Sequence, residues 1–307
     1  MLLLILANLI GIYSLISLPL ASSFTIDVSN LAELGQVNLL EDLYFSQAPF
    51  RKNNDSLGVV ISAVAAVVID KKTGQVLWQK NSELARPIAS ITKLVSALVF
   101  LENNPGWDTE VTINASDYRD GGRRWVYQGE IVTVRDLLNI ALVASDNNAV
   151  ISLVRSTGLT EEEFVKAMNQ KAQALGMNQS VFLEPTGLES SNLSTASDVI
   201  KLAQSAFEVE EIKKATTQSE YSFTVINNKR QDTIKNTNKL LESYLNIQAG
   251  KTGYLEEAGY CLVSEVKNSE NQKVIIAVLG SGTEAGRFQD LKALSQWVFD
   301  NYEWPLD

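Results

Sequence analysis

The chain has 307 residues, of which 45% are hydrophobic and 20% charged, with 36 acidic and 26 basic side chains and a net charge of −10. This is the composition of an ordinary globular protein with one large or two small cores, and its acidic balance argues against nucleic acid as a partner. The sequence contains no histidine, which excludes Ser-His-Asp triads, Cys-His dyads and His-based metal sites. The single cysteine, Cys261, lies in an apolar run and cannot form an internal disulfide, so we expect a buried, inert thiol.

The N-terminus begins with an apolar stretch that reaches about Ala21 and is long enough for a signal sequence or a marginal membrane span. Pro19 and the small residues after it are typical of a cleavage region, although the usual basic residues at the start are missing. A buried hydrophobic helix is the alternative. We expect residues 1–23 to be a signal sequence or membrane anchor, so that the protein is exported and acts outside the cytoplasm, secreted or anchored. Residues 24–57 are predicted to be a linker, and the folded domain to begin near Gly58.

The first predicted strands are residues 59–70, rich in Val, Ile and Ala, and residues 75–79, which the turn Lys71-Lys72-Thr73-Gly74 joins into a β-hairpin. The next element is a helix that opens with Ala89-Ser90-Ile91-Thr92-Lys93 and continues in apolar residues at helical spacing to Leu101. We expect Ser90 in its first turn, where free backbone N–H groups and the helix dipole favour developing negative charge.

Ser90 and Lys93 are three residues apart, so on a helix they share one face. A serine hydroxyl becomes a nucleophile when a base takes its proton, and a lysine is such a base when burial or a neighbouring cation lowers its pKa. The spacing also arises by chance, and it recurs at Ser264 and Lys267, where a strand-like alternation points the two side chains to opposite faces. The pattern therefore selects Ser90 and Lys93 as candidate nucleophile and base.

From about residue 104 to residue 210 the pattern is helical. Three Thr residues each precede an acidic residue by three positions and are predicted to cap helices. These pairs are Thr133 with Asp136, Thr160 with Glu163, and Thr195 with Asp198. Between two apolar helical runs, the turn Ser145-Asp146-Asn147 offers a second hydroxyl and an amide to a site; an ordinary Asx turn or helix cap is the alternative.

Strands return after about residue 219, at spacings typical of antiparallel hairpins, and a last helix is predicted for residues 284–302. The predicted strands are residues 221–226, 247–252, 259–266 and 273–279. Near the end of one of them, Lys251-Thr252-Gly253 follows Gly250, and the two glycines favour close approach of a ligand backbone. Lys251 there is able to bind a carboxylate and to lower the pKa of Lys93; a solvated strand lysine is the alternative.

This order of elements predicts an α+β fold, in which an antiparallel sheet is flanked by N- and C-terminal helices and carries an inserted all-helical lobe. In this division, residues 58–103 and 211–307 form the α/β lobe and residues 104–210 the helical lobe of one catalytic domain, 58–307. The site is expected between the sheet and the helical lobe, where ligand clefts tend to form.

The motifs in this order resemble the penicillin-recognising serine enzymes: a serine at a helix start, S-D-N in a helical lobe and K-T-G on a strand. More closely, the chain resembles the D-alanyl-D-alanine carboxypeptidase family of low-molecular-mass penicillin-binding proteins, from about Ser56 to Trp304. This resemblance implies a β-lactamase/transpeptidase-like fold. It is carried by the segments R-P-I-A-S-I-T-K (86–93), E-P-T-G-L (184–188), N-T-N-K-L-L (236–241), G-K-T-G-Y (250–254) and A-G-Y (258–260).

The resemblance implies a serine-type D-Ala-D-Ala carboxypeptidase that acts on peptidoglycan stem peptides, binds β-lactam antibiotics and needs no metal or organic cofactor. It makes Ser90 the acylated nucleophile, Lys93 the base and Ser145 the relay of a proton to the leaving amine. It also assigns a backbone contact to Asn147 and the terminal carboxylate to Lys251 and Thr252. The oxyanion hole would comprise the N–H groups of Ser90 and Tyr254. The substrate-binding set is then Asn147, Lys251, Thr252, Gly253 and Tyr254.

Two departures from the family pattern bear on the substrate. The usual S-G-N is S-D-N here, which keeps the serine and asparagine, and Thr237 stands where some members carry an arginine, leaving one cation fewer for a free carboxylate. The chain is also expected to lack the extra C-terminal β-domain of many members, because the sequence ends soon after the last predicted helix. A D,D-endopeptidase that cleaves crosslinks is the main alternative. A β-lactamase is disfavoured because the helical lobe lacks an E-x-x-L-N-type stretch, and an inactive wall-binding module because Ser90, Lys93 and Lys251 are intact.

Overall fold

The computed structural model describes residues 48–52 and 55–305. The predicted signal sequence or anchor at residues 1–23, and most of the predicted linker, lie outside the described residues. No helix among the residues that are described is long and apolar enough to cross a bilayer. One part of the predicted linker is a strand: β1 (Phe50–Arg51) pairs antiparallel with β13 (Tyr302–Glu303), which follows the last helix.

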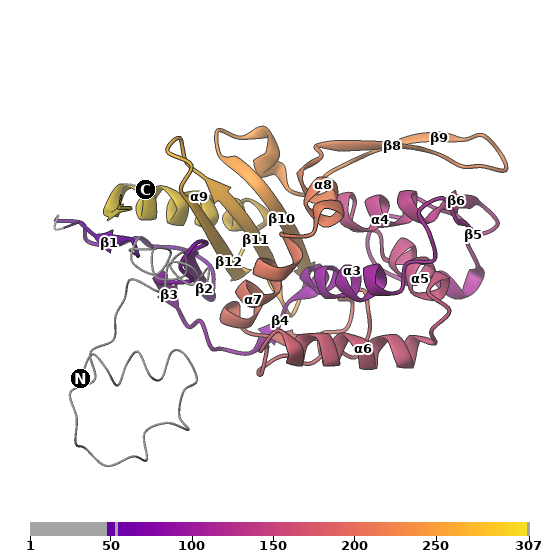
Figure 1. Ribbon diagram of the computed structural model, residues 1–307, viewed down its shortest axis with the longest axis horizontal. Helices are drawn as coiled ribbons and strands as arrows, with labels where there is room; N and C mark the ends of the chain where they lie inside the picture. The colour runs from indigo at the N-terminus through magenta and orange to yellow at the C-terminus, as the bar shows by residue number, and fades with distance from the viewer. Residues whose placement is uncertain (1–47, 53–54, 306–307) are drawn as a thin grey trace, which may run out of the picture. The chain divides into compact units, whose positions relative to one another are not determined.

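A five-stranded antiparallel sheet with the strand order β10-β11-β12-β2-β3 forms one half of this structure (Figure 1). The strands are β2 (Ala65–Asp70), β3 (Val76–Lys80), β10 (Asn246–Leu255), β11 (Gly259–Lys267) and β12 (Lys273–Ser281). The predicted hairpin is confirmed as β2 and β3, although its first strand begins only at Ala65. Strand β10, which carries Lys251, lies at the opposite edge of the sheet.

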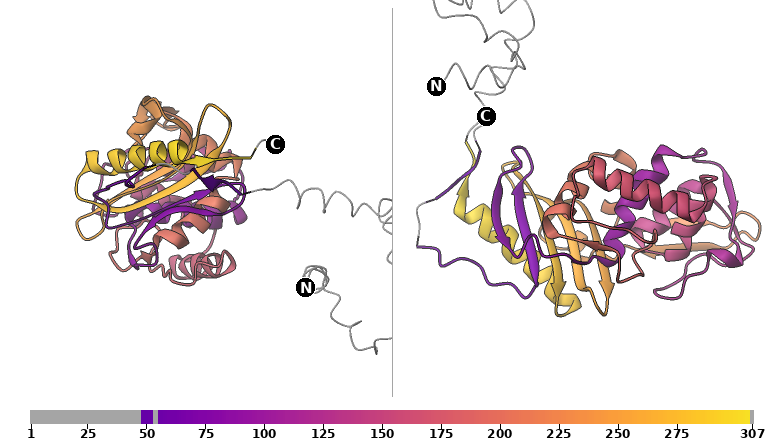
Figure 2. Two further views of the ribbon diagram at one scale, coloured as in Figure 1. Left: turned by 90° about the vertical axis from the view of Figure 1, so that its left-hand side faces the viewer. Right: turned by 90° about the horizontal axis from the view of Figure 1, so that it is seen from below.

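Both faces of the sheet are covered by a hydrophobic core. Successive side chains of a strand point to opposite faces, so alternate residues of β2 belong to different cores. On one face, Ala66 and Val68 share a core with Leu291 and Leu294 of the last helix, α9 (Glu284–Asn301), as predicted for this segment. On the other face, Ala65, Val67 and their neighbours belong to a larger core that includes the remaining helices. Figure 2 shows α9 on one side of the sheet and the other helices across from it.

The second half is mainly helical. Its helices are α3 (Lys93–Glu102), α4 (Val134–Val143), α5 (Asn147–Ser156), α6 (Glu161–Ala174), α7 (Ala196–Ala206) and α8 (Glu210–Thr217). The predicted starts of α4, α6 and α7 are confirmed: Thr133 and Thr160 form reciprocal capping boxes, and the Thr195 side chain accepts a hydrogen bond from the N–H of Asp198.

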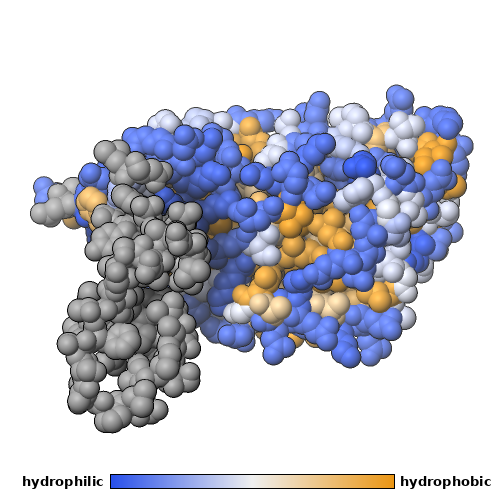
Figure 3. Space-filling view, in the orientation of Figure 1, coloured by the Kyte–Doolittle hydropathy of each residue, from blue (hydrophilic) through white to orange (hydrophobic). Residues whose placement is uncertain are grey.

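The predicted α+β fold with an antiparallel sheet is confirmed, but the helix after Ser90 does not flank the sheet as expected. Helix α3 is buried from Lys93 to Phe100, and a helix that is apolar all round needs cover on every side. It therefore runs through the middle of the helical half, while α7 packs against β12 and β2 (Figure 1). On the face seen in Figure 3 most of the surface is hydrophilic, with apolar residues gathered around α3.

The helical half also contains strands, which the sequence pattern did not predict there. Strand β5 (Glu110–Thr112) pairs with β6 (Ile131–Thr133), and the hairpin of β8 (Glu220–Thr224) and β9 (Gln231–Lys235) lies beside them (Figure 1). The sequence division counted this hairpin with the sheet, but its apolar residues Phe223 and Ile234 are buried in the helical core. The remaining short elements are β4 (Arg86–Pro87), β7 (Leu193–Ser194) and the 3-10 turns η4 (Ala89–Thr92), η5 (Ala115–Asp117) and η6 (Lys239–Glu242).

Candidate active site

Ser90 lies in the 3-10 turn η4, one turn ahead of helix α3, and not in the first turn of an α-helix as expected. The preceding residue, Ala89, has a φ of +48°. This left-handed conformation is uncommon outside glycine and bends the chain in a way that a continuous α-helix does not allow. The bend presents the half-buried Ser90 side chain at the start of α3 while Lys93 opens the helix proper.

Two glycines pack closely against this turn. A Cβ on Gly187 would lie 2.1 Å from the carbonyl oxygen of Ala89, and a Cβ on Gly253 would lie 2.8 Å from that of Ile88 and 3.1 Å from the nitrogen of Ser90. The sequence pattern suggested that Gly253 leaves room for a ligand backbone. Instead it lets strand β10 approach the Ser90 turn, and Gly187 does the same for the loop that precedes β7.

Gly187→Ala is expected to weaken both the fold and the site. The new methyl group meets backbone atoms that cannot rotate away, and the φ of +85° at this position already disfavours a side chain. We expect a loss of about 2 kcal/mol or more in unfolding free energy, and slower acylation of Ser90, measured by thermal melting and by rates of labelling with a fluorescent penicillin.

Gly158→Ala is the matched control, because Gly158 has a similar φ of +79° but a Cβ added there would meet nothing within 4 Å. It should carry only the backbone strain, about 1 kcal/mol, with the labelling rate unchanged. Equal effects of the two substitutions would show that packing against the Ser90 turn is unimportant.

Lys93 is almost fully buried and its Nζ has three polar neighbours: Ser90 Oγ at 2.8 Å, Asn147 Oδ1 at 2.6 Å and the carbonyl oxygen of Thr186 at 2.6 Å. A neutral amine has two N–H bonds and one lone pair. The amide oxygen of Asn147 and the carbonyl of Thr186 can only accept, so they take the two N–H bonds. The lone pair then faces the hydroxyl of Ser90, which is the arrangement that a base needs.

Burial lowers the pKa of Lys93 to about 7, against the opposing effect of the negative charges on Glu184 and Asp146. A buried ammonium loses its hydration, so the neutral form gains in population. Near neutral pH a large fraction of Lys93 is therefore unprotonated. The structure thus brings the predicted pair of Ser90 and Lys93 together, and the pKa of Lys93 is in the range that a general base needs near neutral pH.

A second lysine and a second serine meet across the site. Lys251 Nζ lies 2.9 Å from Ser145 Oγ and 3.0 Å from the carbonyl oxygen of Thr252. Burial holds the pKa of Lys251 well below its usual range, and the positive charges of Lys93 and Arg287 lower it further. Lys251 is thus a buried strand lysine that faces the helical half, and not the solvated alternative.

The turn between α4 and α5 supplies Ser145 and Asn147. Ser145 has a φ of +61°, and the carboxylate of Asp146 caps α5 by accepting from the N–H of Ala149 at 3.0 Å. The helix-cap alternative is therefore correct for Asp146, while its two neighbours face the lysines. Asn147 binds Lys93 through Oδ1 and donates from Nδ2 to the carbonyl oxygen of Gly121 at 2.9 Å.

Thr252 and Tyr254 continue the site along the edge strand β10. The hydroxyl groups of Thr252 and Thr237 lie 2.7 Å apart, so the threonine that replaces an arginine contacts the strand directly. Tyr254 is 52% exposed and stacks on Tyr260, with ring centroids 4.3 Å apart. The second S-x-x-K copy plays no part here: Ser264 and Lys267 lie on β11, and Cys261 on the same strand is buried, which raises its pKa to about 11.

Glu184 was not selected as a site residue from the sequence, although its segment was. Its carboxylate accepts the N–H groups of Thr186 at 2.7 Å, Gly187 at 2.5 Å and Leu188 at 2.9 Å. This folds the chain so that the Thr186 carbonyl reaches Lys93 and Gly187 backs the Ser90 turn. An acidic residue followed at once by Pro-Thr-Gly was the available signal, since carboxylates cap tight turns.

Arg287, on α9, was also missed. Its guanidinium is buried and donates to the carbonyl oxygen of Gly253 at 3.0 Å, which fixes β10 next to the Ser90 turn. Nothing in the local sequence marks this arginine, because it lies in an ordinary amphipathic helix and reaches the site only through packing of α9 on the sheet.

Comparison with known proteins gives consistent matches. The model of the D-alanyl-D-alanine carboxypeptidase family matches residues 51–283. A D-alanyl-D-alanine endopeptidase of Pseudomonas aeruginosa is 34% identical over 258 residues, which cover 82% of this chain and 82% of the relative. The D-alanyl-D-alanine carboxypeptidase DacF of Bacillus subtilis is 32% identical over 247 residues, which cover 78% of this chain and 63% of the relative.

Solved structures match as well. The DD-transpeptidase of Streptomyces K15 superposes with a TM-score of 0.73 at 27% identity, over 80% of this chain and all of the other. Penicillin-binding protein D2 of Listeria monocytogenes, in its ampicillin-bound form, gives a TM-score of 0.71 at 29% identity, over 80% of this chain and all of the other.

Proposed function

The chain belongs to the D-alanyl-D-alanine carboxypeptidase family, and on that premise we propose that Ser90 is the nucleophile with which this serine-type D-Ala-D-Ala peptidase releases terminal D-Ala from peptidoglycan stem peptides. The observation that carries the proposal is the contact between Ser90 Oγ and a buried Lys93 Nζ whose two other neighbours are hydrogen-bond acceptors.

In the proposed acylation step, the Ser90 hydroxyl gives its proton to the neutral amine of Lys93 while Oγ attacks the carbonyl carbon of the D-Ala-D-Ala bond. Negative charge builds on the carbonyl oxygen and is stabilised by the backbone N–H groups of Ser90 and Tyr254. The close approach of β10 to the Ser90 turn, which Gly253 permits, supports this pairing of two amides.

The leaving D-Ala amine then takes a proton through Ser145, and the nearby Lys251 stabilises the transfer. Lys251 and Thr252 hold the terminal carboxylate, and Asn147 holds the peptide backbone. Water then attacks the ester carbonyl carbon and gives one proton to Lys93; this proton passes to Ser90 Oγ as the bond between the acyl carbon and Oγ breaks, and the shortened peptide leaves. In this proposal the protein's own side chains and backbone amides supply every catalytic group for acylation and for hydrolysis of the ester.

The test is covalent labelling by a fluorescent penicillin, whose β-lactam carbonyl takes the place of the scissile D-Ala carbonyl. We expect one stable adduct per chain, located on the tryptic peptide that contains Ser90. The ampicillin-bound relative supports this choice of probe. Absence of labelling at saturating penicillin would contradict the proposed function and leave a wall-binding role as the better account.

Endopeptidase activity on D,D crosslinks is the second candidate. Two observations favour it: Thr237 supplies no cation for a free carboxylate, and relatives from Pseudomonas aeruginosa and Escherichia coli, each 34% identical, are D-alanyl-D-alanine endopeptidases. A time course on purified wall fragments separates the two, since one activity releases D-Ala and the other frees monomers from dimers. Monomer release without D-Ala would make the endopeptidase the correct description.

The proposed substrate places the protein outside the cytoplasm, at the cell wall, and its partners there are stem peptides and β-lactam antibiotics. Residues 1–23 are proposed to direct this export, as a cleaved signal or as a membrane anchor.

A further inference from the structure

The loop of residues 119–125 is attached to the active site by three consecutive side chains, Asp146 and Asn147 of the S-D-N turn and Asn148 after them. Asp146 Oδ2 accepts the N–H of Trp125 at 2.6 Å, Asn147 donates to the carbonyl oxygen of Gly121 at 2.9 Å, and Asn148 Oδ1 accepts the N–H of Arg119 at 2.8 Å. Asp146, Asn147 and Asn148 are all buried. Because Asn147 also binds Lys93, the position of this loop is tied to the catalytic lysine.

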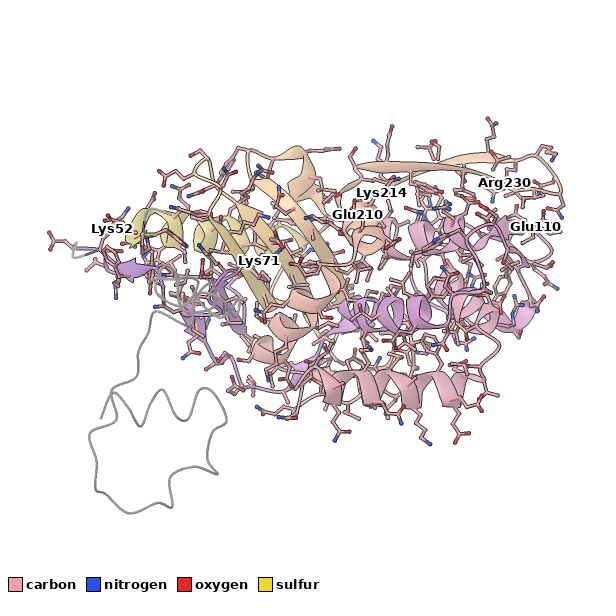
Figure 4. The ribbon with its side chains drawn as sticks, viewed as in Figure 1. Lys52, Lys71, Glu110, Glu210, Lys214 and Arg230 are labelled. Atoms are coloured by element: carbon pink, nitrogen blue, oxygen red, sulfur yellow. The ribbon has the colours of Figure 1, made fainter. Side chains whose placement is uncertain are left out.

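Within this loop, Trp125 is fixed from both sides of its backbone. Its N–H is held by Asp146, and its carbonyl oxygen accepts from Arg230 Nη2 at 2.9 Å. Arg230 lies on the β8–β9 hairpin, above β5 and Glu110 in Figure 4, and forms ion pairs with Glu130 and Asp232, each at 2.8 Å. The hairpin thus helps to fix the backbone that carries the Trp125 indole ring.

The guanidinium of Arg123 stacks on the indole ring of Trp125. Its guanidinium carbon lies 3.8 Å from the centre of the Trp125 ring, while the side chain remains exposed. The other two arginines of the loop are paired with carboxylates: Arg119 with Glu161 at 2.6 Å and Arg124 with Asp120 at 3.2 Å. Among the residues that the structure describes, Arg123 forms no ion pair, although the chain has a net charge of −10.

An unpaired guanidinium that is stacked on a fixed ring is preorganised, so it loses little side-chain freedom when it binds an anion. The loop also lies close to Asn147, since a Cβ on Gly122, next to Arg123, would be only 3.6 Å from Asn147 Nδ2. By the proposed function, Asn147 holds the peptide backbone on the acyl side of the scissile bond. A carboxylate one or two residues before that bond would therefore approach this part of the loop.

We propose that Arg123, stacked on Trp125, is a specificity residue that binds a free carboxylate in the acyl part of the peptide substrate. The inference rests on the proposed function of Ser90 and deepens it, because it names the charge that the substrate carries upstream of the scissile bond. Arg123 takes no part in the chemical steps.

The test compares two synthetic peptides that end in D-Ala-D-Ala and differ by one group on the residue directly before this pair, the second residue before the scissile bond: a γ-linked D-glutamate with a free α-carboxylate, or its α-amide. The protein should prefer the acidic peptide in kcat/KM by about fivefold, the upper end for an exposed ion pair. Arg123→Gln should remove the preference, and salt of about 1 M should reduce it in the unchanged protein, because the Debye length falls to about 3 Å.

Arg124→Gln is the matched control, since Arg124 is the neighbouring arginine but is already paired with Asp120; it should keep the preference. Benzylpenicillin, which is uncharged on its acyl side, should label the Arg123→Gln protein at the normal rate. The proposal is overturned if the Arg123→Gln protein still prefers the acidic peptide, or if the unchanged protein shows no such preference, while penicillin labelling remains normal. Loss of all labelling in the unchanged protein would instead refute the function of Ser90.

Discussion

Ser90→Ala is expected to abolish covalent labelling by penicillin and to leave the fold intact. The substitution removes only the oxygen that forms the ester, so no acyl-enzyme can accumulate. Lys93 loses one neighbour but keeps its contacts with Asn147 and Thr186, and we therefore expect a melting temperature close to that of the unchanged protein. Intact-mass spectrometry after incubation with benzylpenicillin measures the adduct directly.

Ser264→Ala is the control, because it makes the same change in the other S-x-x-K copy, on strand β11. This variant should form the full adduct. If a stable adduct still formed in Ser90→Ala, the nucleophile would lie elsewhere and the proposed mechanism would be wrong.

Lys93→Ala is expected to slow acylation by about 10²–10⁴-fold, the usual effect of losing a general base. It also leaves the carbonyl of Thr186 and the amide oxygen of Asn147 without a donor, which should lower unfolding stability by about 1–3 kcal/mol. Second-order rate constants for penicillin labelling measure the first effect and thermal melting the second. Lys267→Ala, in the strand copy, should leave the labelling rate unchanged.

The pH dependence of the same rate identifies the base. In the proposed mechanism Lys93 acts in its unprotonated form, and burial lowers its pKa to about 7. The acylation rate should therefore rise as the pH passes through about 7 and level off above it. The rise should be missing in Lys93→Ala. A rate that falls with increasing pH over this range, or an unchanged profile in the variant, would contradict the role of Lys93.

Local patterns predicted the parts of this structure that depend on nearby residues. Thr133, Thr160 and Thr195 cap helices because a hydroxyl three residues before an acid is a local solution to free N–H groups. The alternation around Ser264 correctly separated it from Lys267, because a strand has a fixed period of two. The pairing of Ser90 with Lys93 was predicted from a spacing of three residues, and their contact is confirmed at 2.8 Å.

Features that depend on distant packing could not be read in this way. The sequence placed Ser90 in an α-helix, but Gly187 and Gly253, which lie far along the chain, hold it in a bent turn. Arg287 reaches β10 only because α9 covers the sheet, and Glu184 acts by folding its own loop around a lysine some ninety residues earlier. The predicted strand at 221–226, which is β8, was assigned to the sheet because alternation shows that a strand exists, but not which core it joins; its partner β9 was not predicted.

The strand order has a consequence for how the molecule assembles. Strand β2 pairs with β12, so Ile69 lies opposite Ile275, and closing a loop of roughly 200 residues precedes this contact. The β2–β3 hairpin forms locally, yet a lone two-stranded hairpin is only marginally stable in water. The N-terminal part of the sheet must therefore wait, with apolar faces uncovered, until the last strands are available. Lys251, on β10, contacts Ser145 of the helical half, so in the proposed mechanism the site is complete only once these last strands are in place.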